Sequence, residues 1–197
     1  IDEQVLGENQ GESGTGVDYT ATHGIYINGF DNIVITDVNV NMANVGVFVE
    51  NSENTIIKDS TFSNAQWQTI KLLNTVGVQI SNNVFENNRV AVMIGAASHD
   101  QEVHVGVGSN PSASHDNIIK QNEINNTLQT AVILCENTSS NSVFENVING
   151  ASIALQLCSS AKQNEFFQNT VSNIARDLVT GDGSFGRGGD PKENKIY

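Results

Sequence analysis

Short alternations of apolar and other residues recur along the chain at a nearly constant interval. Each copy starts with a small residue and an apolar tripeptide, as in Gly24 with IYI and Gly46 with VFV. The later copies follow Thr69, Ala91, Ala131 and Ala154. These small residues are 22, 23, 22, 40 and 23 residues apart. A second apolar series keeps the same interval: Ile35, Ile57, Ile80, Ile119, Val143 and Phe166. A fixed period of this length is typical of a solenoid.

Within each copy the period is two, which predicts a β-strand with one face inside. Ile25 and Ile27 flank Tyr26, for example, and Val47 and Val49 flank Phe48. The breaks between strands are Asn, Gly and Ser, as turns require. The chain has 27 Asn, 17 Gly and only two Pro, which favours left-handed turn positions and opposes long helices.

A coil of 22–23 residues with three short strands would stack on its neighbours through parallel strands, so equivalent side chains would form ladders along the axis. Four asparagines recur three residues after the second series and predict such a ladder, with each amide bonded to the next: Asn83, Asn122, Asn146 and Asn169.

The segments NIVITDVNV, NTIIKDSTF and VQISNNVFENN resemble the repeats of right-handed parallel β-helix proteins, the pectin-lyase-like superfamily. The resemblance covers roughly residues 22–175. It implies an all-β fold: a right-handed, single-stranded parallel β-helix of six to seven coils. It also implies a protein that is secreted or lies at a cell or virion surface, and that handles polysaccharide, often acidic polysaccharide.

We expect one domain over residues 1–197. Its coils would run from 22 to 176, with an inserted loop at 97–116 where the interval stretches. Residues 1–21 and 177–197 would cover the two ends, because a bare coil exposes strand edges and core.

The net charge of −13, with only nine Lys and Arg, argues against binding to nucleic acid, which needs clustered cations. No run of about 18 apolar residues is present, so we expect no membrane span. Cys135 and Cys158 are one repeat apart on neighbouring coils and should point outward or into the next turn. We favour a stacked pair of free thiols over a disulfide there, although the spacing of neighbouring strands is near disulfide range.

The inserted loop contains three of the four histidines and is the first candidate for a catalytic site. Its candidate residues are His99, Asp100, His104, His115 and Asp116. The two SHD segments could face each other across the neck of the loop as an acid–base pair or a metal site. The alternative is a plain polar loop whose base they close with hydrogen bonds. No metal site is assigned, and calcium is a candidate cofactor.

The outward positions of the first strand are the second candidate, because most are large and apolar: Tyr26, Phe48, Lys71, Met93, Ile133 and Gln156. An exposed apolar stripe marks an interface. It would be a contact between copies in a homo-oligomer, a face covered by the N-terminal residues, or a platform for sugar rings. For a sugar, Tyr26 and Phe48 would supply contacts, and Lys71 and Arg89 would neutralise an acidic unit.

Two functions remain open from the sequence. The first is an enzyme that acts on a polysaccharide by lysis, hydrolysis or epimerisation, with one of the loop histidines as the base. The second is a non-catalytic structural or binding module that oligomerises through the apolar stripe.

Overall fold

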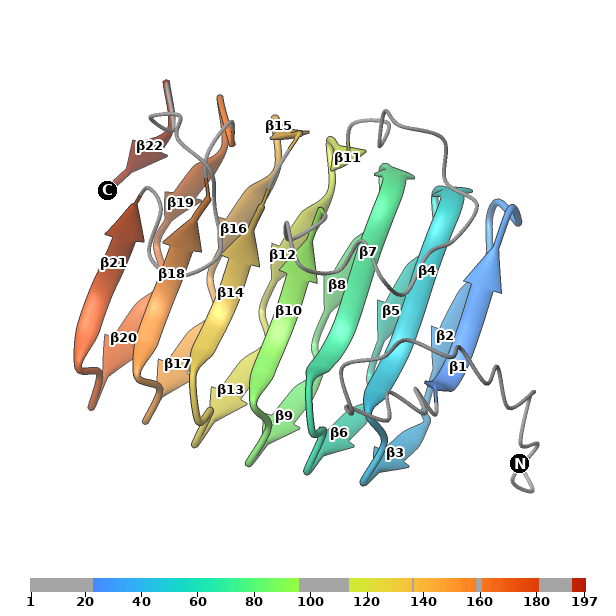
Figure 1. The fold of residues 1–197 in the computed structure, drawn as a ribbon, viewed down its shortest axis with the longest axis horizontal. Helices are drawn as coiled ribbons and strands as arrows, with labels where there is room; N and C mark the ends of the chain where they lie inside the picture. Colours follow the sequence, from blue (N-terminus) through green and yellow to red (C-terminus); the bar gives the residue numbers. More distant parts are fainter. Residues whose placement is uncertain (1–22, 96–113, 136, 159–160, 181–192) are drawn as a thin grey trace, which may run out of the picture.

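The computed structural model describes residues 23–95, 114–135, 137–158, 161–180 and 193–197. Within these ranges all regular secondary structure is β-strand. The strands pair in parallel in three sheets, which we call A, B and C (Figure 1). The chain visits A, B and C in turn, and each visit pairs with the equivalent one a coil earlier. The expected all-β parallel β-helix is confirmed. No helix in these ranges is long and apolar enough to cross a membrane.

Sheet A is the face toward the viewer in Figure 1. Its main path is β1 (His23–Asn28), β4 (Val45–Glu53), β7 (Gln68–Val76), β10 (Val90–Ile94), β14 (Thr130–Leu134), β18 (Ile153–Leu157) and β21 (Arg176–Thr180). Two short strands join its edge, β11 (Ser114–His115) and β15 (Thr138–Ser139).

Sheets B and C complete each coil behind sheet A. Sheet B contains β2 (Val34–Thr36), β5 (Ile56–Lys58), β8 (Gln79–Ser81), β12 (Ile118–Lys120), β16 (Ser142–Phe144), β19 (Glu165–Phe167) and β22 (Lys195–Ile196). Sheet C contains β3 (Asn39–Asn41), β6 (Thr61–Ser63), β9 (Val84–Glu86), β13 (Glu123–Asn125), β17 (Val147–Asn149) and β20 (Thr170–Ser172). The strands β21 and β22 add a rung after the last predicted coil.

The interior is a single column of stacked apolar side chains. The second apolar series lines it, and its members Ile57, Ile80 and Ile119 are fully buried. Phe62 of β6 stacks on Phe85 of β9 with ring centroids 5.4 Å apart. Burial of apolar surface at about 25 cal/mol per Å² is the main stabilising term for such a column.

The coil turns at residues with left-handed backbone. Non-glycine residues with φ between 50° and 60° recur at all three bends. They are Asn32, Asn54, Asp116, Ser140, Gln163 and Glu193 between A and B; Asp37, Asp59, Asn82, Gln121, Glu145 and Gln168 between B and C; and Met42, Asn64, Asn87, Asn126 and Asn173 between C and A. Asn and Asp tolerate this conformation best, which accounts for part of the asparagine content.

The predicted asparagine ladder exists and is buried at the bend between B and C. The Nδ2 of Asn83 donates to Oδ1 of Asn122 at 3.0 Å, and Asn122 and Asn146 repeat the bond to the next rung at 3.0 and 2.9 Å. The same Oδ1 atoms also accept hydrogen bonds from backbone N–H groups. For example, the backbone N–H of Asn122 donates to Oδ1 of Asn146. Each rung therefore locks the register of the next.

A second buried ladder, at the bend between A and B, was not predicted from the sequence. Asn117 donates to Asn141, Asn141 to Asn164, and Asn164 to Asn194, at 2.9 to 3.0 Å. Its first three members are 24 and 23 residues apart, so the interval reveals them, and only Asn194, which follows residues 181–192, falls outside it.

The outer face of sheet A corrects one expectation. Beyond Tyr26, the apolar stripe is not exposed: Phe48 is 1% exposed, and Met93 and Ile133 are also buried. Since a single chain produces this burial, the stripe is covered within the chain. The burial agrees with the alternative in which the chain covers its own stripe. The contact between copies was argued from an exposed stripe, and that argument no longer holds. The segment 1–21 that we expected as the cover lies outside the described residues.

The cysteines correct a second expectation. Cys135 and Cys158 form a disulfide, and the favoured pair of free thiols is wrong. The register of neighbouring coils places their Cα atoms 4.5 Å apart, within the range that a disulfide spans. Both are almost fully buried in a cluster with Val90, Met93 and Ile133 on the outer face of sheet A, which is the first of the two directions expected, outward or into the next turn.

Replacing Asn146 with Ala is expected to reduce the free energy of unfolding by about 2–4 kcal/mol, because it leaves buried donors and acceptors on three coils without partners. The lost partners include the carbonyls of Ile119 and Phe144 and the amide of Asn122. Urea denaturation measures the change. The control is Asn41→Ala, which removes an exposed acceptor and should cost less than about 1 kcal/mol. Equal losses in both variants would contradict a register-locking ladder.

The disulfide predicts that a thiol-alkylating reagent adds nothing to the unfolded, unreduced protein and labels two cysteines after reduction. Mass spectrometry reads the result. The bond closes a segment with a sequence separation of 23, so a Cys135→Ser, Cys158→Ser variant should lose about 3 kcal/mol of stability. Labelling without reduction would show that the thiols are free.

Candidate functional site

An aromatic stack stands on the outer face of sheet A at its N-terminal end. Tyr26 of β1 and Phe48 of β4 are paired in register, and their ring centroids are 5.3 Å apart. His23 stacks against both rings, at 5.4 and 5.5 Å. The Nζ of Lys71, one coil further, lies 5.6 Å from the Phe48 ring centroid. Strict coil register thus turns residues more than 20 positions apart into one continuous stack.

The Tyr26 hydroxyl is held between a carboxylate and an amide. It donates to Oε2 of Glu50 at 2.7 Å and accepts from Nδ2 of Asn28 at 2.8 Å. Burial, then the hydrogen bond and negative charge of Glu50, raise the pKa of Tyr26 to about 12. The phenol therefore stays protonated at neutral pH and gives up its proton less readily than an unperturbed tyrosine, which suits a fixed hydrogen bond rather than acid or base catalysis.

A row of exposed amides runs beside this pair. Asn51 donates to Oδ1 of Asn28 at 2.9 Å, and Asn74 donates to Oδ1 of Asn51 at 2.6 Å. All three belong to sheet A, on successive coils. Amides and a hydroxyl beside an aromatic ring provide both the apolar face and the polar groups that a sugar ring needs.

The four predicted substrate contacts differ sharply in accessibility. Tyr26 is 42% exposed, whereas Phe48 is 1% and Lys71 is 5% exposed. Of these three, only Tyr26 is accessible to a ligand, and Phe48 instead stacks against the Tyr26 ring from the next coil. Arg89 is half-buried and stacks on Trp67 at a different corner, with Cζ 4.1 Å from the ring centroid.

The predicted loop site is described only in part. His99, Asp100 and His104 lie outside the described residues. His115 and Asp116 lie at the bend between A and B, where Nδ1 of His115 is 2.7 Å from Oδ2 of Asp116 and both side chains are exposed. His115 is held by pairing with Val76 and Ser139. His115 and Asp116 are neighbours in the sequence and contact each other. The expected pairing of the two SHD segments across the neck of the loop stays a prediction.

Sequence reasoning missed Glu50 and Trp67. Glu50 could have been found, because alternation puts it on the same face as Phe48 and the coil interval puts it beside Asn28. Trp67 lies at a bend, where period two no longer says which way a side chain points. Among the described residues no group of three or more His, Cys, Asp or Glu could hold a metal ion, so calcium stays a prediction.

Comparisons with known proteins give a family and a set of similar folds. The sequence model of a family described as "Right handed beta helix region" matches residues 23–189. The alginate lyase from Paenibacillus sp. str. FPU-7 superposes with a TM-score of 0.66 at 11% identity, over 89% of this chain and 75% of the lyase. A search by sequence among curated proteins found no significant match.

DFA-IIIase from Arthrobacter chlorophenolicus A6 is similar in two complexes. Bound to DFA-III it gives a TM-score of 0.52 at 11% identity, over 75% of this chain and 41% of that one. Bound to GF2 the values are 0.53 and 12%, over 88% and 50%. The chain thus spans half or less of the DFA-IIIase. At these identities the likeness concerns the fold.

The raised pKa of Tyr26 predicts a loss of stability at high pH. The folded protein keeps this phenolic proton better than the unfolded chain, so the contribution is complete below pH 10 and is lost as pH rises from 10.0 to about 12. The free energy of unfolding should fall more steeply over that window in the native protein than in Tyr26→Phe. Ultraviolet titration of the tyrosines in the native protein and in Tyr26→Phe should show that the ionisation step at the highest pH belongs to Tyr26. Ionisation of Tyr26 near pH 10 would contradict its contact with Glu50.

Proposed function

The chain belongs to the right-handed β-helix family, and we propose that it is a carbohydrate-interacting member whose binding face surrounds Tyr26 on sheet A. The pectin-lyase-like coil carries Tyr26, the Glu50 carboxyl and the amide row Asn28, Asn51 and Asn74 on one surface. The likeness to an alginate lyase and a DFA-IIIase supports a carbohydrate role.

The observation that carries the proposal is the half-exposed Tyr26 ring, braced by Phe48 and bordered by hydrogen-bonding groups. Sugar rings stack on aromatic faces through their C–H groups and bond through hydroxyls at the rim. A solenoid extends one continuous sheet along its axis, so a polymer is the substrate class that fits its length.

The finer proposal is an enzyme that acts by lysis, hydrolysis or epimerisation. Each reaction requires a proton donor and a carboxylate or base within reach of one sugar linkage. Tyr26, whose hydroxyl proton is held by Glu50, would stack on the sugar ring, and Glu50 would supply the carboxylate beside it. The loop residues His99, Asp100, His104, His115 and Asp116 remain the proposed source of a base.

A non-catalytic binding module is the second candidate, and one observation favours it. Glu50 is 3% exposed and Lys71 is 5% exposed, which leaves Tyr26 and the amides as the accessible groups. Such a surface binds without reacting. In either case we propose a secreted or surface location, supported by the Cys135–Cys158 disulfide, because disulfides persist in oxidising compartments.

Tyr26→Ala is expected to weaken binding to the polysaccharide that the native protein retains in affinity electrophoresis by at least about tenfold, because the ring is the main accessible contact. The matched control is Phe30→Ala, which removes a ring that is 65% exposed outside the stack. Retention unchanged in Tyr26→Ala, or lost equally in Phe30→Ala, would remove the proposed face.

Assays for new unsaturated or reducing ends then separate the two candidate functions. Turnover that is lost in Glu50→Gln indicates the enzyme, and binding without turnover indicates the non-catalytic module.

A further inference from the structure

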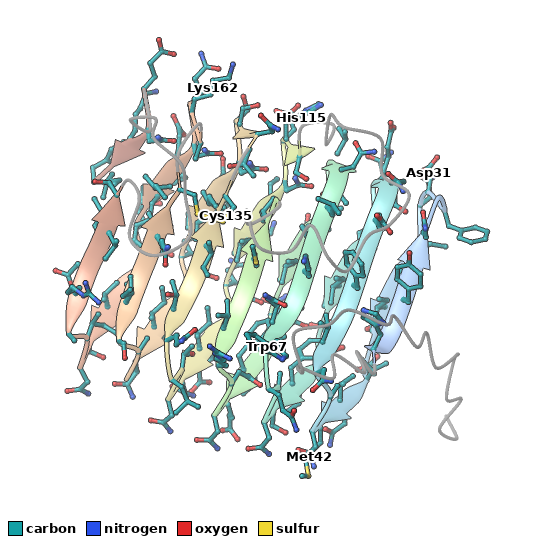
Figure 2. The ribbon with its side chains drawn as sticks, viewed as in Figure 1. Asp31, Met42, Trp67, His115, Cys135 and Lys162 are labelled. Carbon is teal, nitrogen blue, oxygen red and sulfur yellow. A yellow bond between two sulfur atoms is a disulfide. The ribbon has the colours of Figure 1, made fainter. Side chains whose placement is uncertain are left out.

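The C-terminal end of the coil leaves the interior apolar columns open. Leu178 of β21 is 38% exposed, whereas Leu155, its partner one coil earlier, is 1% exposed. Ile196 of β22 is 45% exposed, and Val171 of β20 is half-buried. This end lies on the opposite side of Figure 2 from Asp31, which belongs to the N-terminal coil. Apolar residues at free strand edges favour pairing with another chain.

The three sheets do not end at the same level (Figure 1). The main path of sheet A and the path of sheet B both end on their seventh strand, β21 and β22, whereas sheet C ends on its sixth strand, β20. The chain runs from β20 to β21 to β22, so each of these strands lies one step further along the axis than the strand before it. Within the described residues, the edge of sheet C is therefore one strand behind the edges of sheets A and B.

A second copy, rotated about a two-fold axis perpendicular to sheet A, continues all three sheets at once. With the axis beside the middle of β21, the two β21 strands pair antiparallel at the usual spacing of about 4.8 Å. The rotation also exchanges the sides on which sheets B and C lie, so β22 of each copy comes beside β20 of the other. Leu178 then meets Leu178 of the second copy, and each Ile196 meets a Val171.

The other end-to-end arrangements leave a gap. If a second copy followed in the same direction, its β1 and β2 would pair with β21 and β22, but its β3 would lie one strand too far from β20. If two N-terminal ends met about a two-fold axis, β2 of each copy would lie one strand too far from β3 of the other. A gap leaves strand edges unpaired and loses apolar contacts. The geometry therefore favours a closed dimer over a growing fibre.

The distribution of charge also favours the C-terminal end. Residues 165–180 and 193–197 carry two cations, Arg176 and Lys195, among three anions. Residues 23–41, which form the N-terminal coil, carry two anions and no Lys or Arg. A rotated copy therefore brings both signs to the contact, and the repulsion that a net charge of −13 produces is weaker there than at the N-terminal end.

We propose that two copies of this protein join tail to tail through the C-terminal ends of their coils, about a two-fold axis perpendicular to sheet A. The proposal goes beyond the carbohydrate function and does not depend on it. The axis keeps the outer faces of both copies of sheet A on the same side. The dimer would therefore present two Tyr26 rings, one near each far end, to a single long polymer, which raises avidity when both are engaged.

Multi-angle light scattering of the full chain is expected to give the mass of a dimer at micromolar concentration. Leu178→Lys puts a charge beside the axis and should weaken the dimer by at least about tenfold. The matched control is Leu128→Lys, which changes a leucine that is 70% exposed at a bend away from this end and should leave the dimer intact. Circular dichroism checks that both variants fold. A monomeric native protein, a dimer that Leu178→Lys leaves intact, or equal weakening in both variants would overturn the proposal.

Spin labels determine which ends meet, and they need no change at Leu178. Cys135 and Cys158 are bonded to each other, so an added cysteine is the only free thiol. Labels at Thr180→Cys, in β21, should lie on the order of 15 Å apart across the axis. Labels at Thr36→Cys, in β2, should lie at least about 60 Å apart, because about 12 strand spacings of about 4.8 Å separate them. A short distance between the β2 labels, or a long one between the β21 labels, would show that the contact is not tail to tail.

Discussion

Equal coil length is the constraint on which this structure depends. Parallel strands pair only when each coil returns to the same place, and the buried asparagine ladders make that return specific. Asn122 illustrates this, since its side chain accepts from the coil before and donates to Asn146 on the coil after. A coil that slipped by one residue would leave buried amides unpaired and move core side chains to the outer face.

The candidate sites are products of the same register. Tyr26 meets Glu50, and Trp67 meets Arg89, because one coil places the second residue of each pair beside the first. The two pairs use their aromatic rings differently. Tyr26 offers a ring and a hydroxyl whose proton is held firmly, whereas Trp67 offers its face to a cation. A rigid scaffold can hold both arrangements, one on the outer face of β1 and β4 and the other at the bend between C and A.

The sequence predicted the coil and the ladder because both depend on side chains that repeat. The inward series from Ile35 to Phe166, the small residue before each tripeptide and the ladder from Asn83 to Asn169 all follow the interval. Glu50 was within reach of the same reasoning and was overlooked. The first three rungs of the second ladder, Asn117, Asn141 and Asn164, also keep the interval and were overlooked. Asn194 was not within reach, because residues 181–192 interrupt the interval before it.

The outer face shows where sequence reasoning ended. Alternation correctly placed Phe48 and Lys71 outside the coil, but whether an outward side chain meets solvent depends on what else in the chain lies over it, and no local pattern records that. Phe48 and Lys71 are buried, Tyr26 is accessible, and Cys135 lies close enough to Cys158 to bond. The repeat by itself determined which residues share a column. Only the tertiary structure decided which columns are covered, because covering depends on contacts between segments that the period does not relate.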